Sequence, residues 1–199
     1  NEPVAEFGQM ISRSRGVADG MSTGVNFLMK KNKITVIEGY GRWARGKKVV
    51  VTDKDDKKAE YSAEHIIIAT GGRAKELPNI KIDGKKIIGY REAMTLPVQP
   101  KKMVVVGAGA IGVEFAYFYN TIGTEITVIE FMEQGLLPRE DADISKELTK
   151  VYKKAGMKIL ANSSVEKIEM TDEGCSVIVK NRKDESVQTI TCDIVLSAA

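Results

Sequence analysis

A glycine-rich turn between an apolar run and a helical pattern constrains this chain more than any other feature. Gly107, Gly109 and Gly112 form the pattern Gly-x-Gly-x-x-Gly directly after the apolar run. The first glycine permits a tight turn, the second lets a phosphate approach the backbone, and the third lets helix and strand pack closely. N–H groups at the helix start, around Ala110 and Ile111, then face the anion. The pattern predicts a Rossmann-type βαβ unit that binds a dinucleotide.

An acidic residue at the end of the next expected strand extends this signal. Residues 125–130 read as a strand, and Glu130 lies 18 residues after Gly112. A carboxylate at this place accepts both ribose hydroxyls of an adenosine and repels a 2′-phosphate. Residues 131–134 contain no Arg or Lys. We therefore expect the site to prefer NAD(H) over NADP(H).

Composition excludes several other classes of function. Of the 199 residues, 43% are hydrophobic and 29% are charged, as in a globular protein. Lys and Arg number 30 and Asp and Glu 27, a net charge of +3, and the two signs are interspersed. We expect no nucleic-acid partner and no membrane association. No apolar run is long enough for a membrane span and no cationic start marks a secretory signal, so a cytoplasmic setting is expected, or the mitochondrial matrix in a eukaryote.

The cysteines and the histidine do not form a recognisable redox, metal-binding or catalytic pattern. Cys175 and Cys192 form no Cys-x-x-Cys pair and both lie in strand-like segments. We expect buried free thiols, with a disulfide as the alternative. His65 precedes an apolar run without an acidic or nucleophilic partner nearby in sequence, which favours a structural or surface role. No metal site and no catalytic residue are predicted in this chain.

Apolar spacing and turn residues predict the other elements. Helical spacing over 4–31, interrupted at Gly16 and Gly20, predicts two helices. Strands are expected at 34–43, 48–52 and 63–69, with a solvated hairpin turn from Asp53. Residues 96–100, Leu-Pro-Val-Gln-Pro, deny helix and predict a linker.

The second half of the chain reads as an α/β domain with an added β-meander. After the βαβ unit we expect a helix at 143–155 and a strand at 158–160. Three strand-like segments separated by polar turns then predict the meander, at 165–170, 175–180 and 187–192. The chain begins with Asn and its last residues, 193–199, form an apolar run without a turn or cap. We therefore expect a piece of a longer protein.

A second nucleotide signal lies upstream and introduces a family resemblance. Residues 66–73, Ile-Ile-Ile-Ala-Thr-Gly-Gly-Arg, resemble the strand that ends an FAD-domain segment in the pyridine nucleotide-disulfide oxidoreductases. The resemblance implies that the backbone at Thr70, Gly71 and Gly72 approaches a flavin. The place of this segment, ahead of a linker and a Gly-x-Gly-x-x-Gly unit, strengthens the resemblance.

Within that family the whole chain is similar to the dihydrolipoamide dehydrogenases. The segments that carry the likeness are residues 12–15, 24–41, 109–115 and 128–138, the last with the pattern Val-Ile-Glu-Phe…Leu-Pro. The resemblance implies that Gly41 meets the FAD adenine and that Val165 lies near the NAD adenine. It also implies that Glu114 lies close to the nicotinamide and the flavin.

Departures from the family pattern limit the resemblance to its middle part. An N-terminal FAD fingerprint, a Cys-x-x-x-x-Cys redox pair and a C-terminal dimerisation domain with its His-Glu base are not found in these residues. The resemblance implies an incomplete FAD-domain segment at 1–98 and an NAD-binding domain at 99–199. It further implies a parent homodimer that oxidises dihydrolipoyl groups on the lipoyl domains of a 2-oxoacid dehydrogenase or glycine cleavage complex, with FAD relaying electrons to NAD⁺.

Two alternatives remain open from the sequence. One keeps the chemistry but changes the substrate, as in a mercuric reductase, an NADH oxidase or another disulfide reductase. The other is a stand-alone dinucleotide-binding or regulatory module without catalysis. The complete reading frame, with or without a redox disulfide segment, distinguishes them.

Overall fold

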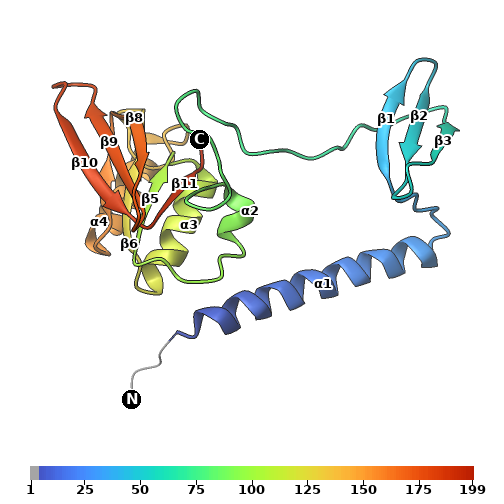
Figure 1. Ribbon diagram of the computed structural model, residues 1–199, viewed down its shortest axis with the longest axis horizontal. Coiled ribbons are helices and arrows are strands. Elements are labelled where there is room, and N and C mark those ends of the chain that lie inside the picture. Colours follow the sequence, from blue (N-terminus) through green and yellow to red (C-terminus); the bar gives the residue numbers. More distant parts are fainter. Residues whose placement is uncertain (1–4) are drawn as a thin grey trace. The chain divides into compact units, whose positions relative to one another are not determined.

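The computed structural model describes residues 5–199, which divide into two compact units (Figure 1). The smaller unit is Arg13–Gly72, and the larger unit joins Arg73–Ala199 to the chain before Arg13. Val4, the expected start of the first helix, lies outside the described residues. No helix among the described residues is long and apolar enough to cross a membrane.

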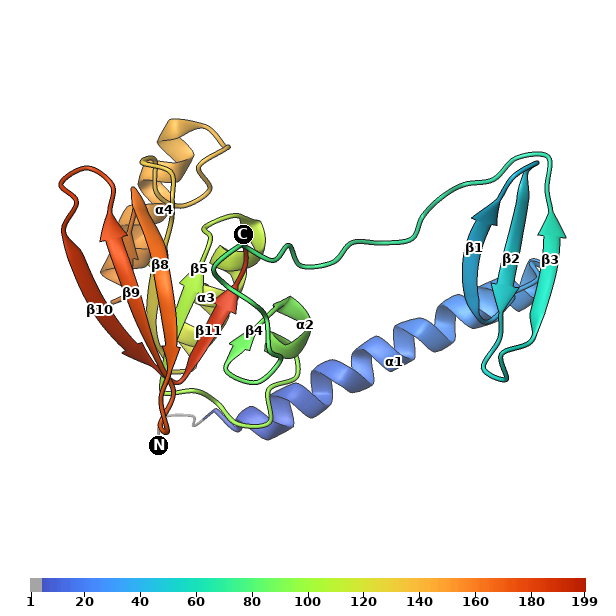
Figure 2. The ribbon, with the colours of Figure 1, turned by 45° about the horizontal axis from the view of Figure 1, so that its top comes forward.

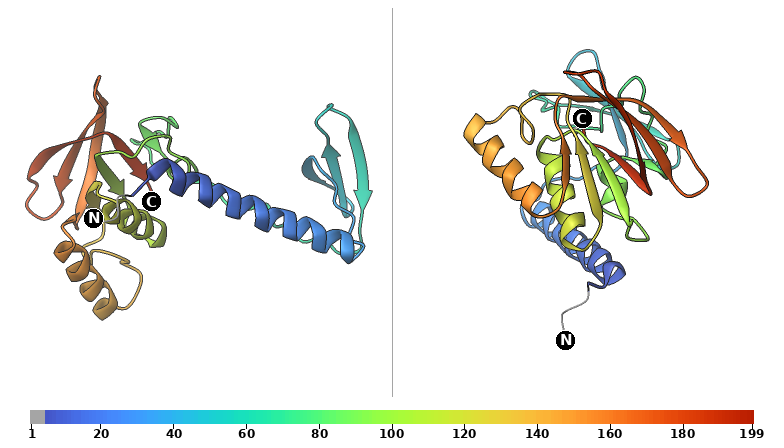
Figure 3. Two further views of the ribbon diagram at one scale, coloured as in Figure 1. Left: turned by 90° about the horizontal axis from the view of Figure 1, so that it is seen from below. Right: turned by 90° about the vertical axis from the view of Figure 1, so that its left-hand side faces the viewer.

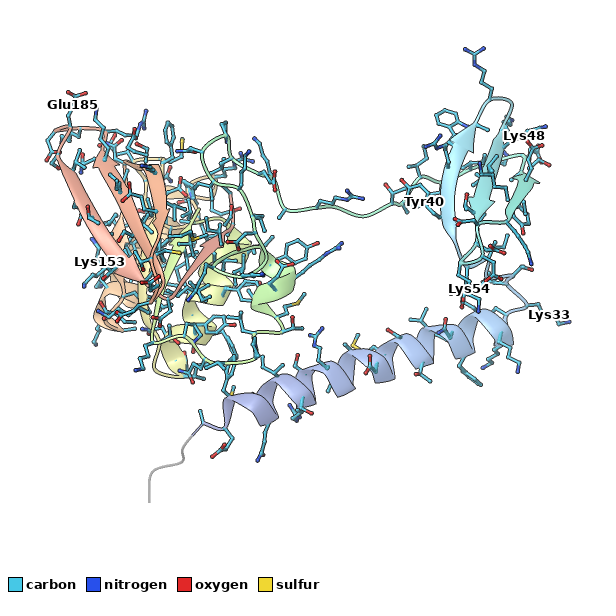
Figure 4. All side chains as sticks on the ribbon, in the orientation of Figure 1. Lys33, Tyr40, Lys48, Lys54, Lys153 and Glu185 are labelled. Atoms are coloured by element: carbon cyan, nitrogen blue, oxygen red, sulfur yellow. The ribbon has the colours of Figure 1, made fainter. Side chains whose placement is uncertain are left out.

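The smaller unit combines most of helix α1 (Phe7–Lys31) with a three-stranded antiparallel sheet. Its strands follow in chain order, β1 (Tyr40–Ala44), β2 (Lys48–Thr52) and β3 (Lys58–Ser62). The carboxylate of Asp53 accepts the N–H groups of Asp55 and Lys57, which closes the expected hairpin turn. Lys48 and Glu60 pair across β2 and β3 at 2.6 Å, and Figure 4 labels Lys48 on this sheet.

Three expectations for this unit were wrong in whole or in part. Helix α1 is a single helix through Gly16 and Gly20. A glycine within a helix costs only about 1 kcal/mol relative to Ala, so it weakens the helix without ending it. Residues 63–69 form no strand, because an extended segment becomes one only when a neighbour accepts its hydrogen bonds, and no described strand does so. The expected strand at 34–43 is likewise shorter and begins at Tyr40.

The larger unit is built on a five-stranded parallel sheet of order β4-β11-β5-β6-β7. Its strands are β4 (Ile87–Ile88), β5 (Lys102–Val106), β6 (Glu125–Ile129), β7 (Lys158–Leu160) and β11 (Ile194–Ser197). Its helices are α2 (Tyr90–Ala93), α3 (Ala110–Thr121) and α4 (Ala142–Lys154). The expected helix at 143–155 and strand at 158–160 are confirmed, and the sheet has the α/β class that the sequence predicted.

The meander covers one face of this sheet and the helices cover the other. It consists of β8 (Ser163–Met170), β9 (Cys175–Asn181) and β10 (Val187–Cys192), as the sequence predicted within two residues. Met103 and Val105 on β5 join the core under the helices, whereas Val104 and Val106 join the core under the meander. Figure 2 shows the meander as a separate layer, and the right-hand view of Figure 3 sets α4 and the meander on opposite sides of the sheet.

Residues 96–100, expected as a linker, connect α2 to β5 inside the larger unit. Leu96 is buried in the core under the helices, and Gln99 Nε2 donates to the Ile122 carbonyl at 2.8 Å. The division of the chain into 1–98 and 99–199 therefore stays a sequence prediction about domains of the parent.

Candidate dinucleotide-binding site

A cavity of about 840 Å³ opens where β5, β6 and β11 end in the larger unit. From β5 the chain adds β6 and β7 on one side, and the last strand, β11, then returns to the other side of β5. The strand order therefore reverses at β5. Ligands of open α/β sheets bind in the crevice that such a reversal creates. The lining residues come from several segments of the chain, namely 77, 79, 80, 106–110, 129–132, 137–140, 163–166, 198 and 199.

The three glycines of the turn have three different environments. Gly107 has a φ of +102°, and a Cβ there would lie 2.7 Å from the Ala198 carbonyl oxygen. A Cβ at Gly112 would lie 2.0 Å from the Gly107 carbonyl oxygen, so helix and turn pack without room for any side chain. Gly109 lines the cavity in an ordinary extended conformation, and a Cβ there would meet nothing. The free space in front of Gly109 is where a phosphate would approach.

Helix α3 begins at this space without a side-chain cap. Gly109 is its N-cap residue, and the first intrahelical bond runs from the Val113 N–H to the Gly109 carbonyl at 3.0 Å. N–H groups in the first turn of a helix have no acceptor within it, which favours an anion. Ala110 lines the cavity, whereas Ile111 is half-exposed outside it and Gly112 packs beneath the turn.

Glu130 is buried beside the glycine turn. Only 7% of it is exposed, and its Oε2 accepts the Ala108 N–H at 2.7 Å. Its Oε1 accepts the Met132 N–H at 2.8 Å. A carboxylate has about four acceptor positions, so both oxygens retain capacity for a ligand hydroxyl. Glu130 and the glycine turn, 22 residues apart in sequence, are thus joined by a hydrogen bond at the cavity wall.

Val165 lines the cavity from β8 and is held by a residue that the sequence did not single out. The side chain of Val165 is buried, and its carbonyl oxygen accepts a short hydrogen bond from Asn79 Nδ2. Asn79 also lines the cavity and contacts the Glu166 carbonyl at 3.3 Å. Since these partners are 86 residues apart, no local pattern indicated the contact.

Glu114 lies on α3 one turn beyond the cavity and is exposed. It does not line the cavity. Burial, together with the charges of Tyr117 and Glu114, raises the pKa of Tyr152, whose hydroxyl donates to the Val113 carbonyl at 3.1 Å. A role for Glu114 beside the nicotinamide and flavin stays a prediction from the resemblance.

Two arginines near the cavity lie outside residues 131–134 and were not indicated by the sequence pattern. Arg139 lines the cavity after the loop returns to the glycine turn, where the Leu137 N–H donates to the Ala108 carbonyl at 2.8 Å. Arg182, from the turn after β9, lies over the Phe131 ring. The positive charge beside the loop that follows Glu130 therefore comes partly from a residue distant in sequence, Arg182.

The residues expected to meet FAD do not by themselves enclose a pocket. Gly41 lies in β1, and Thr70, Gly71 and Gly72 follow β3 along the chain of the smaller unit. All four are exposed, and none lines the cavity described above. The described residues of this unit thus do not fit FAD without further protein surface.

The cysteines lie directly opposite each other on β9 and β10, which their spacing did not reveal. Both are buried and free, and burial, with a smaller effect of Cys175, raises the pKa of Cys192 to about 12. A thiol with so high a pKa is unreactive near neutral pH. His65 lies at the surface beside Glu64. Across residues 5–199 no group of three or more His, Cys, Asp or Glu side chains could hold a metal ion.

Comparison with known proteins agrees with this geometry. The family model of the pyridine nucleotide-disulphide oxidoreductases matches residues 2–199. The chain belongs to this family. It is 41% identical over 173 residues to a dihydrolipoyl dehydrogenase of Zymomonas mobilis, covering 87% of this chain and 37% of that protein. It is 39% identical over 197 residues to one of Mycobacterium tuberculosis, covering 99% and 42%.

Solved structures show the same fold. LpdA from Mycobacterium tuberculosis matches with a TM-score of 0.85 at 24% identity, covering 98% of this chain and 42% of that one. The HOCl-induced flavoprotein disulfide reductase RclA from Escherichia coli, as a mutant in complex with Cu(II), matches with a TM-score of 0.83 at 25% identity, covering 98% and 43%. The chain thus spans about two fifths of the length of these relatives. FAD and NAD are the cofactors of the dihydrolipoyl dehydrogenases in this family.

Proposed function

We propose that this chain carries the NAD(H) site of a dihydrolipoamide dehydrogenase. The buried Glu130 carboxylate, bonded to the glycine turn in a cavity at the strand-order reversal, carries the proposal. The pyrophosphate would lie at Gly109 and the start of α3, and Glu130 would accept the adenosine ribose hydroxyls. Val165 would lie near the adenine. NAD⁺, when bound, supplies the hydride acceptor.

In the parent protein, dihydrolipoyl groups on lipoyl domains of a 2-oxoacid dehydrogenase or glycine cleavage complex would be the substrate, and the active form would be a homodimer. Relatives near 40% identity that share this activity favour it over a mercuric reductase or an NADH oxidase. Residues 1–98 would contribute part of the FAD domain, with Gly41 and Thr70 to Gly72 at its rim. Glu114 would lie between the nicotinamide and the flavin.

Replacement of Glu130 tests the proposal. Hydrogen bonds to a charged group are worth about 1.5–3 kcal/mol each, so Glu130→Ala should weaken NADH binding at least about tenfold. The affinity for NADPH should fall much less, because removing the negative charge also removes its repulsion of the 2′-phosphate. Fluorescence titration of the reduced nicotinamide measures both affinities.

Glu140→Ala is the matched control, since Glu140 is an exposed acid on the rim of the same cavity. It should leave the ratio of NADH to NADPH affinity within about twofold of the unmutated value, because it lacks the two backbone hydrogen bonds that hold Glu130. Equal affinity of the unmutated chain for the two dinucleotides would contradict the proposal.

A further inference from the structure

Arg182 holds the loop that follows Glu130, although it lies outside the cavity. Its Nη1 donates to the Phe131 carbonyl oxygen at 3.0 Å and to Asn162 Oδ1 at 3.2 Å. The central carbon of its guanidinium group lies 3.7 Å from the centroid of the Phe131 ring. Arg182 follows β9 in the hairpin turn that Figure 4 marks with Glu185.

Backbone hydrogen bonds continue this contact to the residue after Phe131. The Arg182 N–H donates to the Asn162 carbonyl at 2.8 Å, and the Asn162 N–H donates to the Met132 carbonyl at 3.0 Å. Met132 in turn donates its N–H to Glu130 Oε1. A continuous set of hydrogen bonds therefore joins the β9–β10 turn to the carboxylate at the cavity wall.

Phe131 and Met132 benefit from such an attachment because both side chains are largely in solvent, unlike the buried Leu136 further along the loop. The side chains of Phe131 and Met132 are 54% and 51% exposed, yet both residues line the cavity. Fixing an exposed segment before a ligand arrives removes part of the entropy cost of binding. Arg suits this role better than Lys, since its planar group stacks on a ring and donates in two directions at once.

We propose that Arg182 is a positioning residue for the adenosine end of the dinucleotide, acting through Phe131 and Met132 on Glu130. The inference rests on the proposed NAD(H) site and assigns to the meander a part in cofactor selectivity. Loss of the Arg182 side-chain contacts leaves the backbone hydrogen bonds and Glu130 in place, but orients Phe131, and with it the carboxylate, less well. Binding of NADH, which uses the carboxylate, suffers more than binding of NADPH.

Two substitutions at Arg182 and one at its neighbour test the proposal. Arg182→Met keeps much of the apolar stem and removes both the charge and the donors. Arg182→Lys keeps the charge, the aliphatic stem and N–H donors, but it loses the planar group that stacks on the Phe131 ring. Lys183→Met removes the same charge from the same exposed turn without touching the loop. NADH and NADPH titrations, amide exchange at Met132 and thermal unfolding are measured for each variant.

We expect Arg182→Met to weaken NADH binding about five- to tenfold and to reduce the preference for NADH over NADPH. The loss is smaller than for Glu130→Ala, because Arg182 acts on the ligand only through the loop. Amide exchange at Met132 should accelerate while the unfolding temperature changes little. Arg182→Lys should restore only part of the affinity, and Lys183→Met should resemble the unmutated chain.

The inference would be overturned if Arg182→Met gave the same NADH and NADPH affinities and the same Met132 amide exchange as Lys183→Met. It would also be overturned if Arg182→Met lost equal affinity for NADH and NADPH while amide exchange at Met132 stayed unchanged. That result would indicate only a distant charge effect. An unmutated chain that binds no NADH would instead refute the proposed site itself, and this inference with it.

Discussion

At the scale of single residues, the glycine turn separates structural from functional requirements. Gly107 and Gly112 are required by the backbone, because a Cβ at either would collide with a carbonyl group. Gly109 faces free space and has a φ of −69°, which every residue adopts readily. Its lack of a side chain matters only to a ligand.

Gly109→Val should therefore fold and fail to bind. The new side chain would occupy the space before the start of α3, so we expect a loss of NADH affinity of more than about tenfold with an unfolding temperature within a few degrees of the unmutated chain. Gly112→Val is the contrasting variant, since its Cβ would lie 2.0 Å from the Gly107 carbonyl oxygen, and it should unfold at much lower temperature. Normal NADH binding by folded Gly109→Val would mean that the phosphates lie elsewhere.

At the scale of elements, Tyr119 joins α3 to α2. Its side chain is fully buried, and its hydroxyl donates to the Ala93 carbonyl oxygen at 2.6 Å. Burial raises the pKa of Tyr119 to about 12 from its usual 10. The folded state thus favours the neutral phenol. The contribution of neutral Tyr119 to the free energy of unfolding is fully present below pH 10 and is lost as the pH rises toward 12.

The stability of the chain should thus fall more steeply between pH 10 and 12 than that of Tyr119→Phe. The difference should reach the order of 1–3 kcal/mol, from about two pKa units at 1.36 kcal/mol each. At neutral pH Tyr119→Phe should itself cost about 1–2 kcal/mol, because the buried Ala93 carbonyl loses its donor. Urea unfolding at several pH values measures both effects, and parallel pH profiles would contradict the assignment.

At the scale of the whole molecule, the smaller unit leaves unusually large apolar side chains in solvent. Ile67 is 91% exposed, Tyr40 71%, Trp43 67% and Ile68 64%. Exposed apolar surface of this extent favours association between copies or with other protein. The residues expected to meet FAD lie in the same unit, among exposed backbone.

A preparation of these 199 residues should therefore be colourless, self-associating and without lipoamide-dependent reduction of NAD⁺. Its cysteines cannot replace a redox pair, because both are buried in the meander, with Cys192 at a pKa of about 12. Flavin absorbance, light scattering after gel filtration and a lipoamide assay check the three statements. A yellow, active preparation whose mass matches these residues alone would contradict them.

The sequence by itself determined the features that depend on neighbours within a few residues. Turn glycines, helix periodicity and strand alternation predicted the βαβ unit, α4, β7 and the meander, and the spacing from Gly112 to Glu130 indicated the acid at the cavity. These signals are local because a helix or a hairpin is specified by residues close along the chain.

Only the tertiary structure decided what distant segments do for one another. It placed Arg182 on Phe131 across 51 residues and Asn79 on Val165 across 86, and it set Cys175 opposite Cys192. It also paired β11 with β4 and β5, while leaving 63–69 without a strand partner among the described residues. An isolated segment encodes its readiness to extend or to donate a hydrogen bond, but the identity of its partner is fixed only when packing brings the two together.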